Sequence, residues 1–261
     1  MKRLINGIHL NILEQGNGPL TLIFLHYFGG SALEWQVIMS HFSAQYRCIA
    51  VDLRGHGDSE APASGYSVDD MADDVICVVQ ELAIQDFILV GHSMSGKVAL
   101  AVAAGTPNHG SPAGLQSLLL VSPSPPVPEP IPDDERQMLL TNHGQRKAAK
   151  KMLKNITAIS VSQAISEQII ADDLRTSESA WTAWLTAGSK EDITSRMAAI
   201  AIPVHITVGS KDGALPPDVQ THMVLPYLTD VTLEQMQGAG HLLPWEVPAE
   251  LAAFIAKKIG V

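Results

Sequence analysis

The sequence predicts an α/β protein in which a mostly parallel central sheet is flanked by helices and interrupted by a helical insertion. Three observations predict this class. Short apolar runs rich in β-branched residues recur along the 261 residues, several of them are apolar at every position, and segments with helical spacing separate them. Continuous apolar runs are typical of strands that are buried on both faces of a parallel sheet. The expected strands span residues 8–13, 20–25, 47–51, 87–90, 115–121, 204–208 and 231–236.

Two segments between these runs are the clearest helices. Residues 68–82 have helical spacing, and their aspartates gather near the start, where negative charge complements the helix dipole. Residues 248–259 form an amphipathic pattern with lysines near its end. We interpret Gly16-Asn17-Gly18 as a hairpin turn between the first two strands.

A proline-rich segment interrupts the alternation of strands and helices after Ser122. Six prolines lie between positions 123 and 132, so this connection is stiff and extended. Residues 133 to about 193 are poor in strand patterns and rich in helical ones, and the β pattern resumes at Ile202. We therefore expect a core of residues 1–122 and 195–261 and a helical cap of residues 123–194, since insertions of this size are usually functional.

Composition excludes several classes of partner. The net charge of −10 argues against nucleic acid and against anionic membrane surfaces. No apolar run has the length of a membrane span, and Met1 is not followed by an apolar signal segment, so a cytoplasmic location is expected. Cys48 and Cys77 lie in apolar runs and are expected to be buried free thiols. The histidines lack metal-ligand spacing, so neither a metal nor a cofactor is expected; the oligomeric state is left open.

The segment Gly91-His92-Ser93-Met94-Ser95-Gly96 carries the strongest functional signal. It lies between the apolar run 87–90 and a helical run from Lys97 to Ala104. A sharp Gly-x-Ser turn between a strand and a helix lifts a serine hydroxyl above the sheet, where it can act as a nucleophile. This pattern predicts Ser93 as the nucleophile, and Ser95 as a small packing residue of the first helical turn.

A serine nucleophile needs a base, and the base needs an orienting acid. Asp212 follows the run 204–208, and His241 follows the run 231–236, so the three residues occur in the order serine, acid, histidine. The carboxyl ends of parallel strands meet at one edge of a sheet, where this order is expected. We predict Asp212 and His241 as the acid and the base. Other aspartates that could compete for the acid's role are Asp192, Asp218 and Asp230.

Two backbone N–H groups are expected to bind the oxyanion that forms during acyl transfer. One belongs to Met94, directly after Ser93. The other is expected from the loop His26–Ser31, whose glycines let the chain fold tightly; within it we choose Phe28, with Tyr27 next. A further polar set is expected to hold nearby turns together by hydrogen bonds: His26, Asp52, Arg54 and His56.

On these motifs the chain resembles the α/β-hydrolase fold superfamily, in its esterase-like serine-hydrolase branch with an inserted helical cap. The resemblance covers nearly the whole chain and implies Ser93 as nucleophile, His241 as base and Asp212 as acid. Two positions depart from the usual motifs. Tyr27 stands where a glycine is usual in the loop that supplies an oxyanion donor. Ser95 replaces the last glycine of the Gly-x-Ser-x-Gly turn, which is called the nucleophile elbow. The matching segments are 26–31, 52–59, 91–96, 209–212 and 238–241.

The expected reaction is hydrolysis of a small or medium, mostly apolar carboxylic ester through an acyl-enzyme. Tyr27, Trp181 and Trp184 are candidate pocket residues, although packing within the cap would equally explain the tryptophans. A C–C bond hydrolase and a lactonase would use the same triad. A serine nucleophile argues against epoxide hydrolases and haloalkane dehalogenases, which use aspartate in this superfamily. A ligand-binding receptor with little turnover is the alternative from another class.

Overall fold

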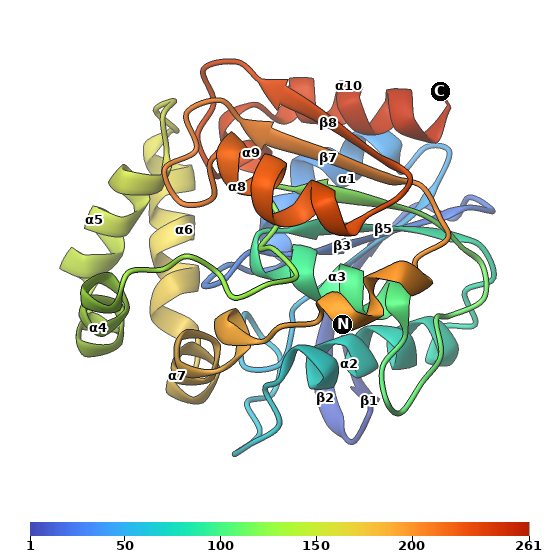
Figure 1. Ribbon diagram of the computed structural model, residues 1–261, viewed down its shortest axis with the longest axis horizontal. Helices are drawn as coiled ribbons and strands as arrows, with labels where there is room; N and C mark the ends of the chain where they lie inside the picture. Colours follow the sequence, from blue (N-terminus) through green and yellow to red (C-terminus); the bar gives the residue numbers. More distant parts are fainter. Residues whose placement is uncertain (261) are drawn as a thin grey trace.

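The computed structural model describes residues 1–260 and contains one eight-stranded sheet (Figure 1). The strand order is β1-β2-β4-β3-β5-β6-β7-β8. The pairs β1–β2 and β2–β4 are antiparallel, and every other neighbouring pair is parallel. The strands are β1 (Lys2–Ile5), β2 (Ile8–Gln15), β3 (Thr21–Leu25), β4 (Arg47–Val51), β5 (Phe87–His92), β6 (Leu115–Val121), β7 (Val204–Gly209) and β8 (Val231–Met236).

The predicted fold class is confirmed, because each expected apolar run forms one of the strands β2 to β8. The prediction missed β1 and was wrong about the turn at residues 16–18. These residues do not close a hairpin, since β2 pairs with β1 and β4, whereas β3 lies between β4 and β5. The glycines serve close backbone approach instead: a Cβ at Gly18 would lie 1.9 Å from the Gln45 carbonyl oxygen, and one at Gly16 would lie 2.2 Å from that of Tyr46.

Helices cover both faces of the sheet. On one face, α1 (Gln36–Phe42) and α10 (Pro248–Ile259) pack against the side chains of Leu22 and Phe24 of β3. On the other face, α2 (Val68–Glu81) and α3 (Met94–Ala104) pack against Ile23 and Leu25. Alternate residues of β3 therefore belong to two apolar cores, as expected of a strand buried on both faces. The shorter helices outside the insertion are η1 (Ala32–Trp35), η3 (Thr194–Ala199), α8 (Pro217–Val219), η4 (Gln220–Val224), η5 (Leu225–Tyr227) and α9 (Leu243–Glu246).

Local sequence explains where α2 and α3 begin. Ser67 caps α2 by accepting a hydrogen bond from the Asp70 N–H, and the Asp70 carboxylate accepts one from the Ser67 N–H in return. α3 begins at Met94, three residues earlier than the expected Lys97. Its first turn includes Gly96, where a Cβ would lie 2.3 Å from Cβ of Pro123. Only glycine allows the start of this helix to approach the chain that leaves β6.

Residues 123–194 contain helices and no strand. The helices are α4 (Asp133–Asn142), α5 (Arg146–Ile156), α6 (Gln163–Arg175), α7 (Glu178–Thr186) and η2 (Gly188–Lys190). α4 to α7 gather beside the sheet rather than on one of its faces (Figure 1). The buried Lys97 ammonium of α3 connects both ends of this segment, donating hydrogen bonds to the carbonyls of Val127 at 3.0 Å and Glu191 at 2.8 Å.

No helix in the described part of the chain combines the length and apolarity that crossing a membrane requires. Cys48 is buried and Cys77 is half-buried, and both are free thiols.

Candidate active site

Ser93 lies in a strained turn between β5 and α3. Its φ of 54° and ψ of −118° place it in a region that a residue with a side chain seldom adopts, at a cost of order 1–3 kcal/mol. The turn is compact because Gly91 has no side chain: a Cβ there would lie 2.4 Å from the carbonyl oxygen of Ser95. Strand, strained serine and helix follow one another as the elbow motif requires.

The structure brings Ser93, His241 and Asp212 together at the carboxyl edge of the sheet. The Ser93 hydroxyl donates to Nε2 of His241 at 2.9 Å, and Nδ1 of His241 lies 2.8 Å from Oδ2 of Asp212. Ser93 follows β5, Asp212 follows β7 and His241 follows β8. All three are at most 8% exposed. The arrangement has the geometry of a nucleophile, a base and an orienting acid.

The pKa values of Asp212 and His241 are shifted by each other's charge. Burial alone would raise the pKa of Asp212, but His241 and the N–H of Leu215 outweigh it and lower that pKa to about 2. Burial alone would lower the pKa of His241, yet the Asp212 carboxylate outweighs it and raises that pKa above 6.5. Asp212 also accepts hydrogen bonds from the N–H groups of Ala214 and Leu215, at 2.8 and 2.9 Å. An ionised Asp212 therefore strengthens His241 as a base.

Glu246 holds the loop that carries His241. Its buried carboxylate accepts hydrogen bonds from the N–H groups on both sides of His241, those of Gly240 and Leu242, each at 3.0 Å. The same carboxylate accepts from Ala158 at 2.8 Å and Ile159 at 2.7 Å, in the connection between α5 and α6. One side chain thus ties the histidine loop to the helical segment. The sequence analysis missed this residue; an acid among Leu, Pro, Trp and Val was its only signal.

A second buried chain of polar groups reaches the backbone of His241. Nε2 of His92 donates to the His241 carbonyl at 2.9 Å, and Nδ1 of His92 lies 3.2 Å from the Glu34 carboxyl group. Burial lowers the pKa of His92 to about 3 and raises that of Glu34 well above its usual value. Both shifts favour the neutral forms of His92 and Glu34. Sequence reasoning missed these two residues as well, since nothing in the chain's pattern connects them.

Of the two expected oxyanion donors, Met94 directly follows Ser93, and Phe28 lines the same cavity as Ser93. Among the described residues, neither the N–H of Met94 nor that of Phe28 has an intramolecular acceptor. The loop before Phe28 is fixed by His26, whose Nδ1 donates to the Tyr27 carbonyl at 2.8 Å. The hydroxyl of Ser95 donates to the His26 carbonyl, so it connects the elbow to this loop. Ser95 is therefore more than a small packing residue.

The remaining polar set stabilises the neighbouring turns. Asp52 accepts hydrogen bonds from the N–H groups of Ala32 at 2.6 Å and Asp58 at 2.8 Å. Nε2 of His26 accepts from the N–H of Leu53 at 3.0 Å. Arg54 forms a buried ion pair with Asp74 at 2.5 Å. These residues contact turns of the core and do not line the cavity beside Ser93.

A cavity of about 130 Å³ opens beside Ser93 and His241. Tyr27, Phe28 and Trp184 line it, which agrees with two of the three expected pocket residues. Trp181 lines an adjoining cavity instead and packs against Phe28, with ring centroids 4.4 Å apart and the rings tilted by 33°. The cavity beside Ser93 contains acidic side chains but no lysine or arginine among its described lining residues; the acids are Glu129 and Glu135.

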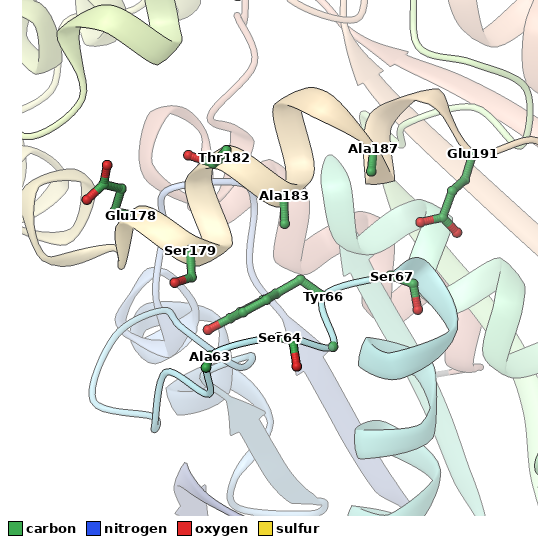
Figure 2. A pocket seen from close by; sticks show the side chains of 11 residues that line it. Ala63, Ser64, Tyr66, Ser67, Glu178, Ser179, Thr182, Ala183, Ala187 and Glu191 are labelled. Atoms are coloured by element: carbon green, nitrogen blue, oxygen red, sulfur yellow. The ribbon is translucent and has the colours of Figure 1, made fainter.

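Another depression, of about 510 Å³, lies away from this site (Figure 2). It is open and lies between the loop at residues 63–67 and α7. None of Ser93, Asp212 and His241 lines it, so we do not assign it a role in catalysis. Residues 1–260 contain no group of three or more His, Cys, Asp or Glu side chains arranged to hold a metal ion.

A mostly parallel sheet whose carboxyl edge holds a strained serine, a histidine and an aspartate defines the α/β-hydrolase class. The chain belongs to the alpha/beta hydrolase family, whose model matches residues 22–254.

Comparison with known proteins finds relatives and similar structures that include a hydrolase, a chloroperoxidase, an esterase and a lactonase. The 2-(acetamidomethylene)succinate hydrolase of Mesorhizobium japonicum is 38% identical over 104 residues, 40% of this chain and only 37% of that protein's length. The non-heme chloroperoxidase of Streptomyces lividans is 29% identical over 269 residues, covering 94% of this chain and 96% of the relative. An esterase from Exiguobacterium antarcticum has a similar structure, with a TM-score of 0.90 at 22% identity, covering 100% of this chain and 99% of that one. An enol-lactonase from Burkholderia xenovorans matches with a TM-score of 0.83 at 19% identity over the full length of both chains.

Proposed function

We propose that this protein is a serine hydrolase that cleaves a small or medium, mostly apolar carboxylic ester. The observation that carries the proposal is the hydrogen-bonded chain from the Ser93 hydroxyl through His241 to Asp212, which ends in a cavity. A serine in this arrangement can lose its proton to the imidazole as it attacks a carbonyl carbon. The esterases among the similar proteins support the same reaction.

Acylation begins when Oγ of Ser93 bonds to the ester carbonyl carbon and Nε2 of His241 takes the hydroxyl proton. The carbonyl oxygen becomes an oxyanion, which the N–H groups of Met94 and Phe28 stabilise. The imidazolium is stabilised by the Asp212 carboxylate. His241 then gives its proton to the alkoxide oxygen as the C–O bond breaks, so that the alcohol leaves and Ser93 remains acylated.

Deacylation repeats these steps with water. His241 takes a proton from water, whose oxygen attacks the acyl carbon of the serine ester. The second tetrahedral intermediate collapses, and His241 returns the proton to Oγ of Ser93. The carboxylic acid is released, and the free hydroxyl of Ser93 is restored.

We propose further that residues 123–194 form a cap over this site. Its side chains supply a large part of the wall around Ser93: Ile131, Leu139, Met152, Ile156, Trp184 and Leu185. These six side chains are apolar and favour an apolar acyl or alcohol group, while Glu129 and Glu135 of the same segment add polar groups to the wall. The carbonyl of Ile156 in α5 also accepts the N–H of His241 at 2.7 Å, so the cap contacts the catalytic loop directly.

The charge of the cavity separates this reaction from C–C bond hydrolysis of an acidic diketone. Such a substrate carries negative charge, which a lysine or arginine would have to neutralise. The described lining residues include Glu129 and Glu135 but no lysine or arginine, so no cationic side chain among them would neutralise such an anion. A neutral ester needs no such side chain. A lactone would be opened by the same steps, because it is a cyclic ester.

The test is turnover of a panel of 4-nitrophenyl esters and lactones by the native chain and by Ser93→Ala. The proposal expects hydrolysis of short- and medium-chain esters that falls at least about 10³-fold in the variant, in line with loss of a triad member. Turnover of lactones alone would assign the protein to lactonases. No turnover of any substrate by the folded native chain would support the receptor alternative.

A further inference from the structure

A larger cavity adjoins the one that contains Ser93. It has a volume of about 520 Å³ and lies among the helices α4, α5, α6 and α7. The two cavities share four lining residues, which are Glu135, Leu139, Met152 and Ile156. The two cavities are therefore adjacent, and these four side chains lie at their boundary.

Asp173 contributes a carboxyl group to the wall of this cavity. The residue is 5% exposed, and within residues 1–260 its carboxylate has neither a hydrogen-bond donor nor a cationic partner. Its neighbour Asp172 shows the contrast, since that carboxylate accepts from Ser31 at 2.9 Å and pairs with Arg175 at 2.6 Å. Buried carboxyl groups in proteins are ordinarily paired. An unpaired one in the wall of a cavity is therefore a candidate ligand-binding group.

Aromatic rings and a glycine surround this carboxyl group. An added Cβ at Gly29 would lie 3.6 Å from Oδ2 of Asp173 and 3.3 Å from the ring of Trp181. The Trp181 ring also stacks on His143, with centroids 4.5 Å apart. The carboxylate is the group here that can bind an organic cation, through a charge-assisted hydrogen bond.

Other charged residues also line the two cavities. Glu129 lines the catalytic cavity, and Glu135 lines both. The lysines of the larger cavity, Lys147 and Lys151, are exposed on α5, where water screens their charge. Asp173, by contrast, is buried. Glu135 is exposed like the lysines, so Asp173 is the buried acid among the described lining residues of the larger cavity.

We propose that Asp173 binds an ammonium group at the end of the substrate remote from the scissile carbonyl. The inference rests on the proposed ester hydrolysis and narrows its substrate to an ester with an apolar body and a cationic amine. The ammonium group donates a hydrogen bond to the Asp173 carboxylate, while the ester carbonyl lies at Ser93. Burial raises the pKa of Asp173 to about 7 in the free protein, and a bound cation would stabilise its ionised form.

The kinetic test compares 4-nitrophenyl esters of equal chain length that end in ammonium, hydroxyl or methyl, with six to ten carbons, at neutral pH. The native protein is expected to prefer the ammonium ester over the methyl ester at one or more lengths. Asp173→Asn and Asp173→Ser are expected to reduce this kcat/KM ratio about tenfold or more, as for loss of a hydrogen bond between charged groups. Asp134→Asn, which removes an exposed carboxylate of α4, is expected to retain the native ratio.

Two kinetic results would overturn the proposal. One is a ratio that is the same in the native protein and in both Asp173 variants at every length. The other is a preference for hydroxyl over ammonium, which would assign a neutral donor to the site. Circular dichroism shows whether each variant is folded, and having two variants keeps the test available if one is not.

A binding experiment separates failure of this site from failure of the proposed function. Calorimetric titration with hexylammonium chloride requires no turnover, so it is carried out with the native protein, Ser93→Ala and Asp173→Asn. We expect binding to the first two and at least about tenfold weaker binding to the third. Binding that depends on Asp173 in a protein that cleaves no ester would overturn only the hydrolase function. Absence of binding in a protein that cleaves esters would overturn only the ammonium site.

Discussion

Replacing Glu246 with glutamine tests how the histidine loop is held. The carboxylate accepts four backbone hydrogen bonds, from Ala158, Ile159 and Gly240 through Oε2 and from Leu242 through Oε1. A glutamine side chain has one carbonyl oxygen, and its NH₂ group donates. In the better of its two orientations, the N–H of Leu242 loses its acceptor and faces another donor.

The magnitude follows from these contacts. A buried N–H without an acceptor costs about 1–3 kcal/mol, and the three bonds that remain lose the charge of the carboxylate. We therefore expect the free energy of unfolding to fall by about 2–3 kcal/mol, which for a domain of this size lowers Tm by roughly 4–12 °C. Because Gly240 and Leu242 flank His241, kcat is expected to fall about tenfold with less change in KM.

The assay combines thermal unfolding with ester turnover. Glu81→Gln is the matched control, since Glu81 is exposed at the end of α2 and the change there is expected to cost less than about 0.5 kcal/mol. The reasoning would be refuted by a Glu246→Gln protein whose Tm and kcat equal those of the control.

Three further predictions concern the elbow, the base and the buried lysine. Ser93→Gly is expected to remove activity and to raise the free energy of unfolding by about 1 kcal/mol relative to Ser93→Ala, because glycine relieves the positive φ; equal urea midpoints would contradict this. Since neutral His241 is the base and its pKa is raised, kcat/KM should fall with decreasing pH through a midpoint above 6.5, whereas a midpoint well below that value would argue against the role. Lys97→Met should lower the free energy of unfolding by about 2–4 kcal/mol, because it leaves the carbonyls of Val127 and Glu191 without their donor. The exposed Lys190→Met should change it little, and similar urea midpoints for the two variants would contradict a stabilising role of Lys97.

The fold was largely predictable because its strands are local apolar runs. A run such as residues 87–90, buried on both faces, is visible without knowledge of its neighbours. β1 was missed because most of it is exposed and it has little apolar pattern. The hairpin interpretation at residues 16–18 failed because glycines indicate a backbone requirement, and only the fold shows that the requirement is close approach to Tyr46.

The positions of Ser93, Asp212 and His241 were predictable for a related reason. Each directly follows a recognisable parallel strand, and such strands end at one edge of the sheet. Glu246 and Asp173 offered no comparable signal. Their significance depends on which distant groups approach them: four N–H groups in one case and no partner among the described residues in the other.

The central claim is that Ser93 is an activated nucleophile. A fluorophosphonate reacts covalently with such a serine, and peptide mass spectrometry identifies the modified residue. The account predicts a single adduct on Ser93 in the native protein and none in Ser93→Ala. An adduct of equal yield in both proteins, or one located on another residue, would contradict it.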